Sequence, residues 1–292
     1  MNGPTGTPNR TWLRRIVRSD VVDLVTWGNA WLLWSISYFP HTKTLTILCL
    51  SVLLFWPGLR RTPVFWWGVT LAWLPQLVFN WHQNEDHVYF VFYWLTACGL
   101  ALWGSQPRTA MALSARCLIG LCFLIAAGWK TSSPEFFRSE VLAFKMLEDY
   151  RFRQTVTTPI AGFSATNAAN FDGLLRDIKS HDSHLTGFDV PVSSRLLWLS
   201  WAMTWWTVWI EWTIGILFLL PARWSSPLTR HIGLMAFVVS TYIVVPVMGF
   251  ANAFLLMGLA QTDRRQTRLR VAYLAVWGAL VMWSIWRPAV LP

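Results

Sequence analysis

The sequence predicts an all-α membrane protein, a polytopic helix bundle of eight to nine membrane segments with one large external loop. Of its 292 residues 54% are hydrophobic and only 13% are charged, whereas about a quarter of the residues in soluble domains are charged. Hydrophobic runs such as 88–104 and 196–220 are about as long as a helix needs to cross a bilayer. The 22 tryptophans are a third indication, because this residue concentrates at membrane interfaces.

The hydrophobic segments follow one another along most of the chain. We expect membrane helices near 21–39, 44–58, 64–80, 88–104, 111–130, 196–220, 230–260 and 271–288. The segment 230–260 is long for one crossing, and Pro246 and Gly249 offer a place for it to break into two. We favour the break, which gives nine segments, because it puts the arginines of 264–270 on the same side as the other basic linkers.

The charge of +10 comes mostly from short linkers between the hydrophobic segments, so a membrane topology explains it better than nucleic-acid binding does. The basic linkers are 60–61, 105–116, 221–230 and 264–270. The positive-inside rule makes them cytoplasmic. The chain then divides into a cytoplasmic basic N-terminus (1–20), membrane helices 1–5 (21–130), an external loop (131–193) and the remaining membrane helices (194–292).

The external loop holds 8 of the 14 acidic residues. Apolar side chains recur at helical spacing over 136–151, which predicts an amphipathic helix along the membrane surface. The stretch 157–170 is rich in Thr, Ala, Gly and Asn and is typical of an irregular loop. His181 and His184 have a spacing that a metal site can use, but structural zinc sites need four ligands, so we assign no metal. The four cysteines lie in apolar segments and are expected to be buried and free.

His87 and Lys130 are the candidate catalytic residues. His87 starts one hydrophobic segment at its external end, and Lys130 closes the next segment at the same end. Neighbouring antiparallel helices would bring both side chains to one depth, where an imidazole and a partly desolvated amine form an acid–base pair. The alternative stays open: lysine at a helix end often extends to the interface, and histidine in a turn is often only hydrogen-bonded.

The segment 196–220 carries two stripes at helical spacing. The polar stripe should face the bundle interior, since a glutamate within the membrane needs partners; it consists of Ser200, Thr204, Thr207, Glu211 and Gly215. The second stripe is aromatic and consists of Trp198, Trp201, Trp205, Trp209 and Trp212. Two interpretations stay open, a cavity for a flat ligand beside Glu211 or a ridge of tryptophans packed against lipid, and we favour lipid packing for most of the tryptophans.

Three short motifs, taken in their order along the chain, resemble those of the vitamin K-dependent γ-carboxylase superfamily. They resemble more closely those of its small bacterial members, the horizontally transferred transmembrane domain (HTTM) proteins. The first motif is Asn-x-x-His-x-Tyr-Phe, with Asn84, His87 and Tyr89. The second is Ala-Gly-x-Lys, ending at Trp129-Lys130 and followed by an acidic–aromatic pair. A later helix with Glu211 ahead of a basic turn completes the likeness, which covers about residues 20–285 in order and hydropathy.

The resemblance implies a membrane enzyme with a reduced quinone, of the vitamin K or menaquinol type, as its cofactor. In the γ-carboxylases a lysine deprotonates the quinol with a histidine's help, oxygenation makes a strong base, and a glutamate γ-carbon is carboxylated. Carried over, Lys130 is the base and His87 its helper, with Asn84, Tyr89, Trp129, Thr207 and Glu211 as binding residues. The family carries two consecutive lysines where this chain has Lys130-Thr131.

Another branch of the superfamily helps to mature a secreted peptide toxin, so the resemblance also implies a bacterial inner-membrane location and a secreted-peptide partner. Two functions are therefore expected from the sequence. One is a carboxylase-like enzyme that acts at the external membrane face on a quinol or a secreted peptide. The other is a non-enzymatic accessory subunit or peptide-maturation partner in a membrane complex, which docks through its tryptophan-rich surface.

Overall fold

The computed structural model describes residues 17–179, 193–221, 223–245 and 247–290, and all of their regular structure is helical. The first half contains helices that match the first five predicted segments: α2 (Val21–Ser35), α3 (Pro40–Phe55), α4 (Pro63–Phe79), α5 (Asp86–Trp103) and α6 (Pro107–Ser132). The second half contains the helices that match the remaining segments: α11 (Ser194–Leu219), α12 (Pro227–Tyr242), α13 (Met248–Ala260) and α14 (Thr267–Val290).

Proline and side-chain caps mark where many of these helices begin. Proline suits the first turn of a helix, because its missing N–H would have no partner there. It opens α3, α4, α6 and α12. The side chains of Asp20 and Ser193 instead accept hydrogen bonds from the first-turn amides of α2 and α11, which satisfies groups that the helix itself leaves unpaired.

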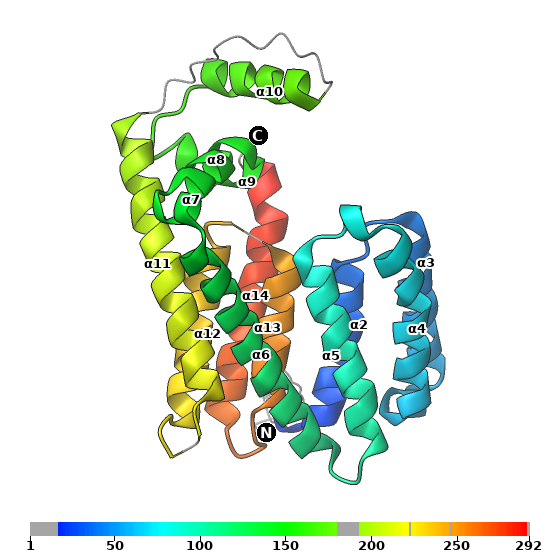
Figure 1. Cartoon of the computed structure of the whole chain (residues 1–292). Coiled ribbons are helices and arrows are strands. Elements are labelled where there is room, and N and C mark those ends of the chain that lie inside the picture. Colours follow the sequence, from blue (N-terminus) through cyan, green and yellow to red (C-terminus); the bar gives the residue numbers. More distant parts are fainter. Residues whose placement is uncertain (1–16, 180–192, 222, 246, 291–292) are drawn as a thin grey trace, which may run out of the picture.

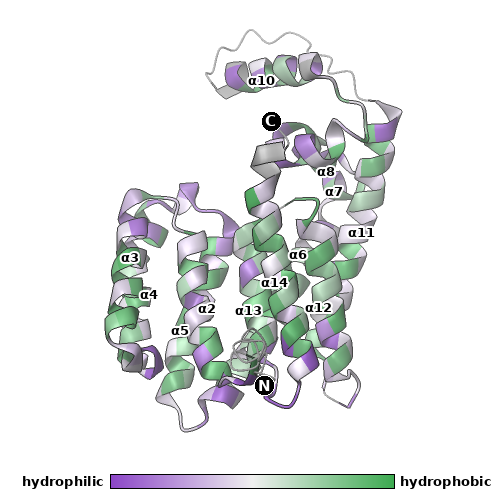
Figure 2. Cartoon of the chain, turned by 180° about the vertical axis from the view of Figure 1, so that it is seen from behind, coloured by the Kyte–Doolittle hydropathy of each residue, from purple (hydrophilic) through white to green (hydrophobic). Residues whose placement is uncertain are grey.

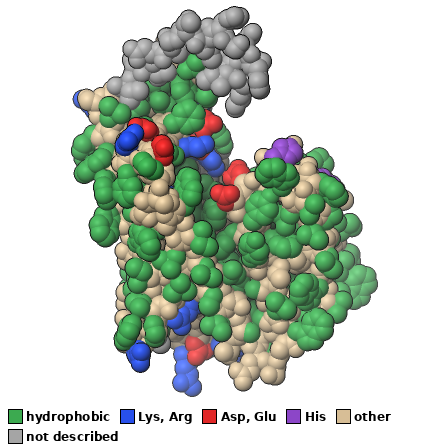
Figure 3. Space-filling model, viewed as in Figure 1, with side chains coloured by type: hydrophobic (Ala, Val, Ile, Leu, Met, Phe, Trp, Pro, Cys, Tyr) green, Lys and Arg blue, Asp and Glu red, His purple; other side chains and the backbone are tan. Residues whose placement is uncertain are grey.

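Three described helices are long and apolar enough to cross a membrane: α6, α11 and residues 267–286 of α14. The helices α3, α4 and α13 are apolar but shorter. Hydrophobic side chains cover the middle of the molecule, whereas charged side chains gather toward its two ends (Figure 3). The helical membrane fold is confirmed at this level, while the predicted number of crossings is not established by helix length and composition.

The predicted break in 230–260 is confirmed. The chain leaves α12 at Tyr242 and enters α13 at Met248; Pro246 itself lies outside the described residues. The arginine linkers consequently meet at one end of the bundle, which we call the arginine end. Ion pairs tie them together there, from Arg61 and Arg264 to Asp20 and from Arg108 to Asp263.

The helices form two groups that pack side by side (Figure 1). The helices α2–α5 make one group, and α6 with α11–α14 makes the other. Helix α13 joins them, because it packs against both α2 and α6. Gly28 of α2 has no room for a larger side chain, since Leu256 of α13 and Trp277 of α14 lie against it. This close packing makes one buried core out of both groups.

Residues 133–179 form short helices at the opposite end, which we call the loop end. They are α7 (Pro134–Phe137), α8 (Glu140–Glu148), α9 (Tyr150–Phe152), a π-helical turn (Arg153–Thr157) and α10 (Ala165–Lys179). The predicted amphipathic helix is present but shorter than 136–151. Hydrophilic residues gather at this end and at the arginine end, and the helical segments between the two ends are mostly hydrophobic (Figure 2).

One prediction for this segment is wrong in part. The stretch 157–170 is predicted to be irregular, and residues 158–164 are turn and coil, but α10 begins at Ala165. Phe171 of α10 is buried against the loop end and contacts Phe144, and Asp172 pairs with Arg153 at 2.9 Å. Tertiary packing therefore stabilises a helix that its own composition does not favour. The predicted histidine pair, His181 and His184, lies outside the described residues.

Candidate functional site at the loop end

Lys130 and Glu211 form an ion pair between the loop-end part of α6 and the middle of α11, with the Lys130 ammonium donating to Oε1 of Glu211. Only 18% of the Lys130 side chain and 8% of the Glu211 side chain are exposed. The Lys130 ammonium also lies 5.5 Å from the centre of the Phe136 ring, a distance at which a cation is attracted to an aromatic face. Lys130 is therefore held by two neighbours, one of which is a buried acid.

The pair sits where α6 and α11 approach closely. Gly215 allows this approach, because a Cβ there would lie 3.0 Å from the backbone nitrogen of Leu124. Small residues at such contacts let transmembrane helices pack tightly. Glu211 stands one turn before Gly215, so its carboxylate is directed at α6 and at Lys130 rather than at lipid.

The carboxylate of Glu211 is only half satisfied. Oε1 accepts from Lys130, but Oε2 is buried and has no hydrogen-bond partner among the described residues. Thr204 lies on the same buried face of α11, two turns away, and its Oγ1 is also buried without a partner. Buried polar atoms are rarely left unpaired, so Oε2 of Glu211 and Oγ1 of Thr204 are exceptions on this packed face of α11.

The predicted polar stripe of α11 is largely confirmed. Ser200, Thr204, Glu211 and Gly215 are buried. Thr207 is only partly buried and donates to the backbone oxygen of Met203. The aromatic stripe faces outward for the most part, with Trp198 and Trp209 67% and 66% exposed, as the lipid-packing interpretation expects.

His87 belongs to a different cluster at the same end. It is 1% exposed, and its Nε2 lies 3.1 Å from the hydroxyl of Tyr38. Its Nδ1 lies 3.3 Å from Oε2 of Glu85, an ion-pair distance that lacks the direction of a hydrogen bond. Phe250 packs edge-on against the ring, and Gly249 of α13 leaves the space that the ring occupies.

The electrostatics of this cluster favour a neutral phenol and a charged carboxylate. Burial, with Glu85 nearby, raises the pKa of Tyr38 to about 12, so the phenol keeps its proton and can donate to Nε2 of His87. His87 and, at longer range, Arg151 hold the pKa of Glu85 below its usual value against the opposing effect of burial. The three side chains form a Tyr–His–Glu chain that the sequence did not reveal.

The structure thus brings Lys130 to Glu211 but gives His87 other partners. No contact joins His87 to Lys130 among the residues that the structure describes, although His87 lies in the first turn of α5 and Lys130 in the last turn of α6. Their direct pairing therefore stays a prediction. The signal for the Lys130–Glu211 pair was present in the buried stripe of α11, which requires a cationic partner for its glutamate.

The other predicted binding residues have structural partners. Asn84 closes the turn between α4 and α5 by exchanging hydrogen bonds with Gln76 at 2.8 and 3.1 Å. Tyr89 donates to the backbone oxygen of Trp81 at 3.1 Å. Trp129 is 61% exposed and points away from the bundle interior. Thr131, which follows Lys130, donates within its own helix, to Ala127 and Gly128.

Comparison with protein-family models, with curated proteins and with solved structures finds no match to this chain. The γ-carboxylase-like assignment therefore stays an expectation based on the short motifs. Among the described residues, no group of His, Cys, Asp and Glu side chains is arranged to hold a metal ion. The four cysteines are free, with Cys98 buried and the other three partly buried.

Proposed function

We propose that this chain is a γ-carboxylase-like membrane protein that transfers a proton at the Lys130–Glu211 pair. The helices α2–α6 and α11–α14 would be nine membrane segments, with the arginine end in the cytoplasm and the loop end outside. The substrate would be a quinol, or a secreted peptide, that reaches the pair from the external leaflet. The observation that carries the proposal is a buried lysine–glutamate pair with one carboxylate oxygen left without a partner.

The pair holds one exchangeable proton between two basic groups. When the substrate binds and excludes water, separated charges become more costly, so the Lys130 ammonium would pass its proton to Glu211 and become an amine base. Lys130 would then take a proton from an acidic hydroxyl or carbon acid of the substrate. The ammonium so formed would remain beside the substrate's new negative charge and stabilise it.

A reduced quinone fits the polar atoms that α11 leaves unpaired. The quinol hydroxyl that loses its proton would donate to the Lys130 amine beside Glu211 Oε2, and the hydroxyl of Thr204 offers a second hydrogen bond on the same face. When bound, the quinol would supply the oxygen-dependent chemistry that the family uses to abstract a carbon-bound proton. The protein's own part would be to orient the ring, take the first proton and exclude water.

The Tyr38–His87–Glu85 chain would serve as a second proton path at the loop end. Tyr38 and the Glu85 side chain are each about half exposed, whereas His87 between them is buried, so the chain begins and ends at the surface of the loop end. We assign it to proton release after the reaction, because an imidazole between a phenol and a carboxylate can pass a proton between them.

The test is quinol turnover by the purified protein in nanodiscs. Reduced menaquinone, oxygen, ¹³C-bicarbonate and a glutamate-containing peptide are added, and quinol loss and ¹³C in the peptide are measured. We expect Lys130→Ala to abolish both, while Lys145→Ala retains them, because Lys145 is exposed and pairs only with Glu148 on the loop end. Full turnover by Lys130→Ala would overturn the proposal.

A docking role is the second candidate, favoured by the outward tryptophans of α11. Trp198, Trp201 and Trp209 are all more than half exposed, and aromatic residues are enriched at interfaces. This role predicts that a partner co-purifies in fixed ratio. It also predicts that Trp201→Ala and Trp209→Ala release the partner, whereas Lys130→Ala does not.

A further inference from the structure

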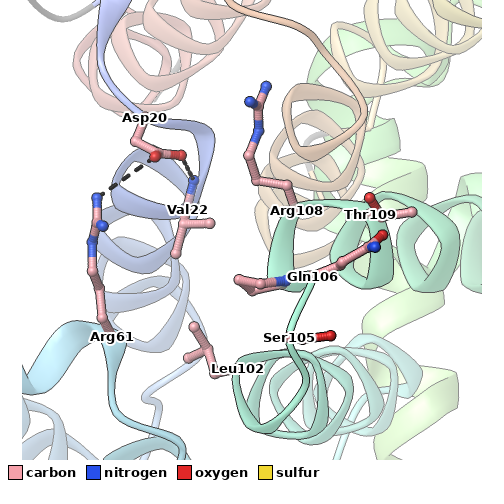
Figure 4. Close-up of a pocket in the computed structure, with 9 residues that line it drawn as sticks. Asp20, Val22, Arg61, Leu102, Ser105, Gln106, Arg108 and Thr109 are labelled. Atoms are coloured by element: carbon pink, nitrogen blue, oxygen red, sulfur yellow. Dashed lines mark hydrogen bonds and ion pairs between the residues drawn. The ribbon is translucent and has the colours of Figure 1, made fainter.

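A cavity of about 400 Å³ opens at the arginine end, between the start of α2 and the start of α6. Its two walls face each other (Figure 4). Asp20, Val22 and Arg61 line one wall, and Gln106, Arg108 and Thr109 line the other. Its volume lies within the range of small-ligand sites, and the Lys130–Glu211 pair does not line it.

The α6 wall carries solvent-exposed side-chain donors that form few hydrogen bonds among the described residues. Arg108 uses only Nη2, in a 3.3 Å contact with Asp263, so its Nε and Nη1 are free among the described residues. No hydrogen bond is formed by the Thr109 hydroxyl or by the Gln106 side chain in the same part of the chain. This wall therefore presents donors from the N-cap and the first turn of one helix.

The backbone adds to this set. Helix α6 is 26 residues long, has no side-chain cap and carries no acidic residue in its first turn. The first amides of a helix are unpaired and lie at the positive end of its dipole. Because no acid compensates this end, an anion in the cavity would meet the Arg108 and Thr109 amides as well as the guanidinium.

The acidic residue on the opposite wall is already neutralised. Asp20 accepts from the Val22 amide at 3.1 Å and pairs with Arg264 at 2.9 Å and Arg61 at 3.7 Å. Arg61 also pairs with Asp23 at 2.7 Å. An anion bound to Arg108 would thus face Asp20, the acid of the cavity lining, only in a form already paired with two arginines.

We propose that this cavity binds a phosphate group, held by Arg108, Thr109 and the first turn of α6. Phosphate offers several acceptor oxygens and a negative charge, which suits a guanidinium, a hydroxyl and helix amides together. The cavity lies at the end of a helix long enough to span a bilayer. Two sources share this chemistry, the headgroup of an anionic phospholipid and a soluble phosphate, and the experiment separates them.

The experiment measures binding of phosphatidic acid and, separately, of inorganic phosphate to the detergent-purified full chain, by native mass spectrometry and by the melting temperature. We expect the parent protein to bind, with an affinity that falls as salt rises. Arg108→Ala and Thr109→Val should each weaken binding, by about tenfold for the arginine. Stabilisation by phosphatidic acid alone would identify a lipid headgroup, and an equal response to inorganic phosphate a soluble ligand.

Two further variants keep the test decisive. Arg268→Ala removes an exposed positive charge from the same end, outside the cavity, and should change the affinity less than twofold. Asp263→Asn removes the acid that competes for Arg108 and should tighten binding, which gives an answer even where Arg108→Ala does not fold. Equal affinity in the parent, Arg108→Ala and Asp263→Asn would overturn the phosphate site.

Discussion

Breaking the Lys130–Glu211 pair from one side should destabilise the protein strongly. Lys130→Ala leaves Glu211, whose side chain is 8% exposed, without its cation. Removing one partner of a buried pair costs about 3–5 kcal/mol. Because 18% of the Lys130 side chain reaches the surface, we expect the lower end, about 3 kcal/mol. The cation–aromatic contact with Phe136 adds roughly 0.5–1 kcal/mol to the loss.

Thermal unfolding in detergent, followed by tryptophan fluorescence, measures this effect. The total loss of about 3.5–4 kcal/mol, at roughly 2–4 °C per kcal/mol for a chain of this size, should lower the melting temperature by about 7–16 °C. The matched control is Lys145→Ala, which breaks an exposed pair with Glu148 and should cost about 0.5 kcal/mol or less.

The double variant Lys130→Met with Glu211→Leu separates stability from chemistry. Replacing both members of a buried ion pair by apolar residues of similar size is often neutral or stabilising. We therefore expect its melting temperature to return to within about 3 °C of the parent. A Lys130→Ala melting temperature equal to that of the parent, or a double variant as unstable as the single one, would refute the buried-pair reasoning.

Three further predictions follow from the packing and the charges. In Gly249→Ala a methyl group would occupy the place of the buried His87 ring. The ring must then move aside, so the melting temperature should fall, and an unchanged melting temperature would contradict the close contact. Burial opposes ionisation of Asp149, but hydrogen bonds from Arg151 outweigh it and lower the pKa of Asp149. The stabilisation from the ionised Asp149 is thus complete above about pH 4 and is lost as the pH falls further. The melting temperature of Asp149→Asn should therefore depend less on pH between pH 5 and 3 than that of the parent. Arg116 donates to the backbone oxygens of Phe218 and Leu220 at 2.6 Å; Arg116→Ala should expose the end of α11 and speed amide exchange there, measured by hydrogen–deuterium exchange.

The sequence predicted the helices and their order well because hydropathy determines both. The break within 230–260 was also predictable, since only two helices return the arginines of 264–270 to the end where Arg61 lies. Helix α10 was missed because its Thr- and Asn-rich start disfavours a helix. It is stabilised by Phe171 and Asp172 contacts, which join residues far apart in sequence.

The candidate site was predictable only in part. Helical spacing placed Glu211 on the buried face of α11, and the end of a hydrophobic run singled out Lys130. Their pairing depends on how α6 and α11 align across 81 residues of sequence, which no local pattern encodes. Tyr38 was missed because a tyrosine in a short turn carries no distinctive pattern, although its hydroxyl lies 3.1 Å from His87.

Quinol consumption by the Lys130→Met, Glu211→Leu double variant tests the proposed chemistry most directly. The variant is designed to keep the melting temperature of the parent, so a loss of turnover would report chemistry and not unfolding. We predict that the parent consumes reduced menaquinone and that the folded double variant does not. Consumption at the parent's rate in the folded double variant would contradict a proton-transfer role for this pair.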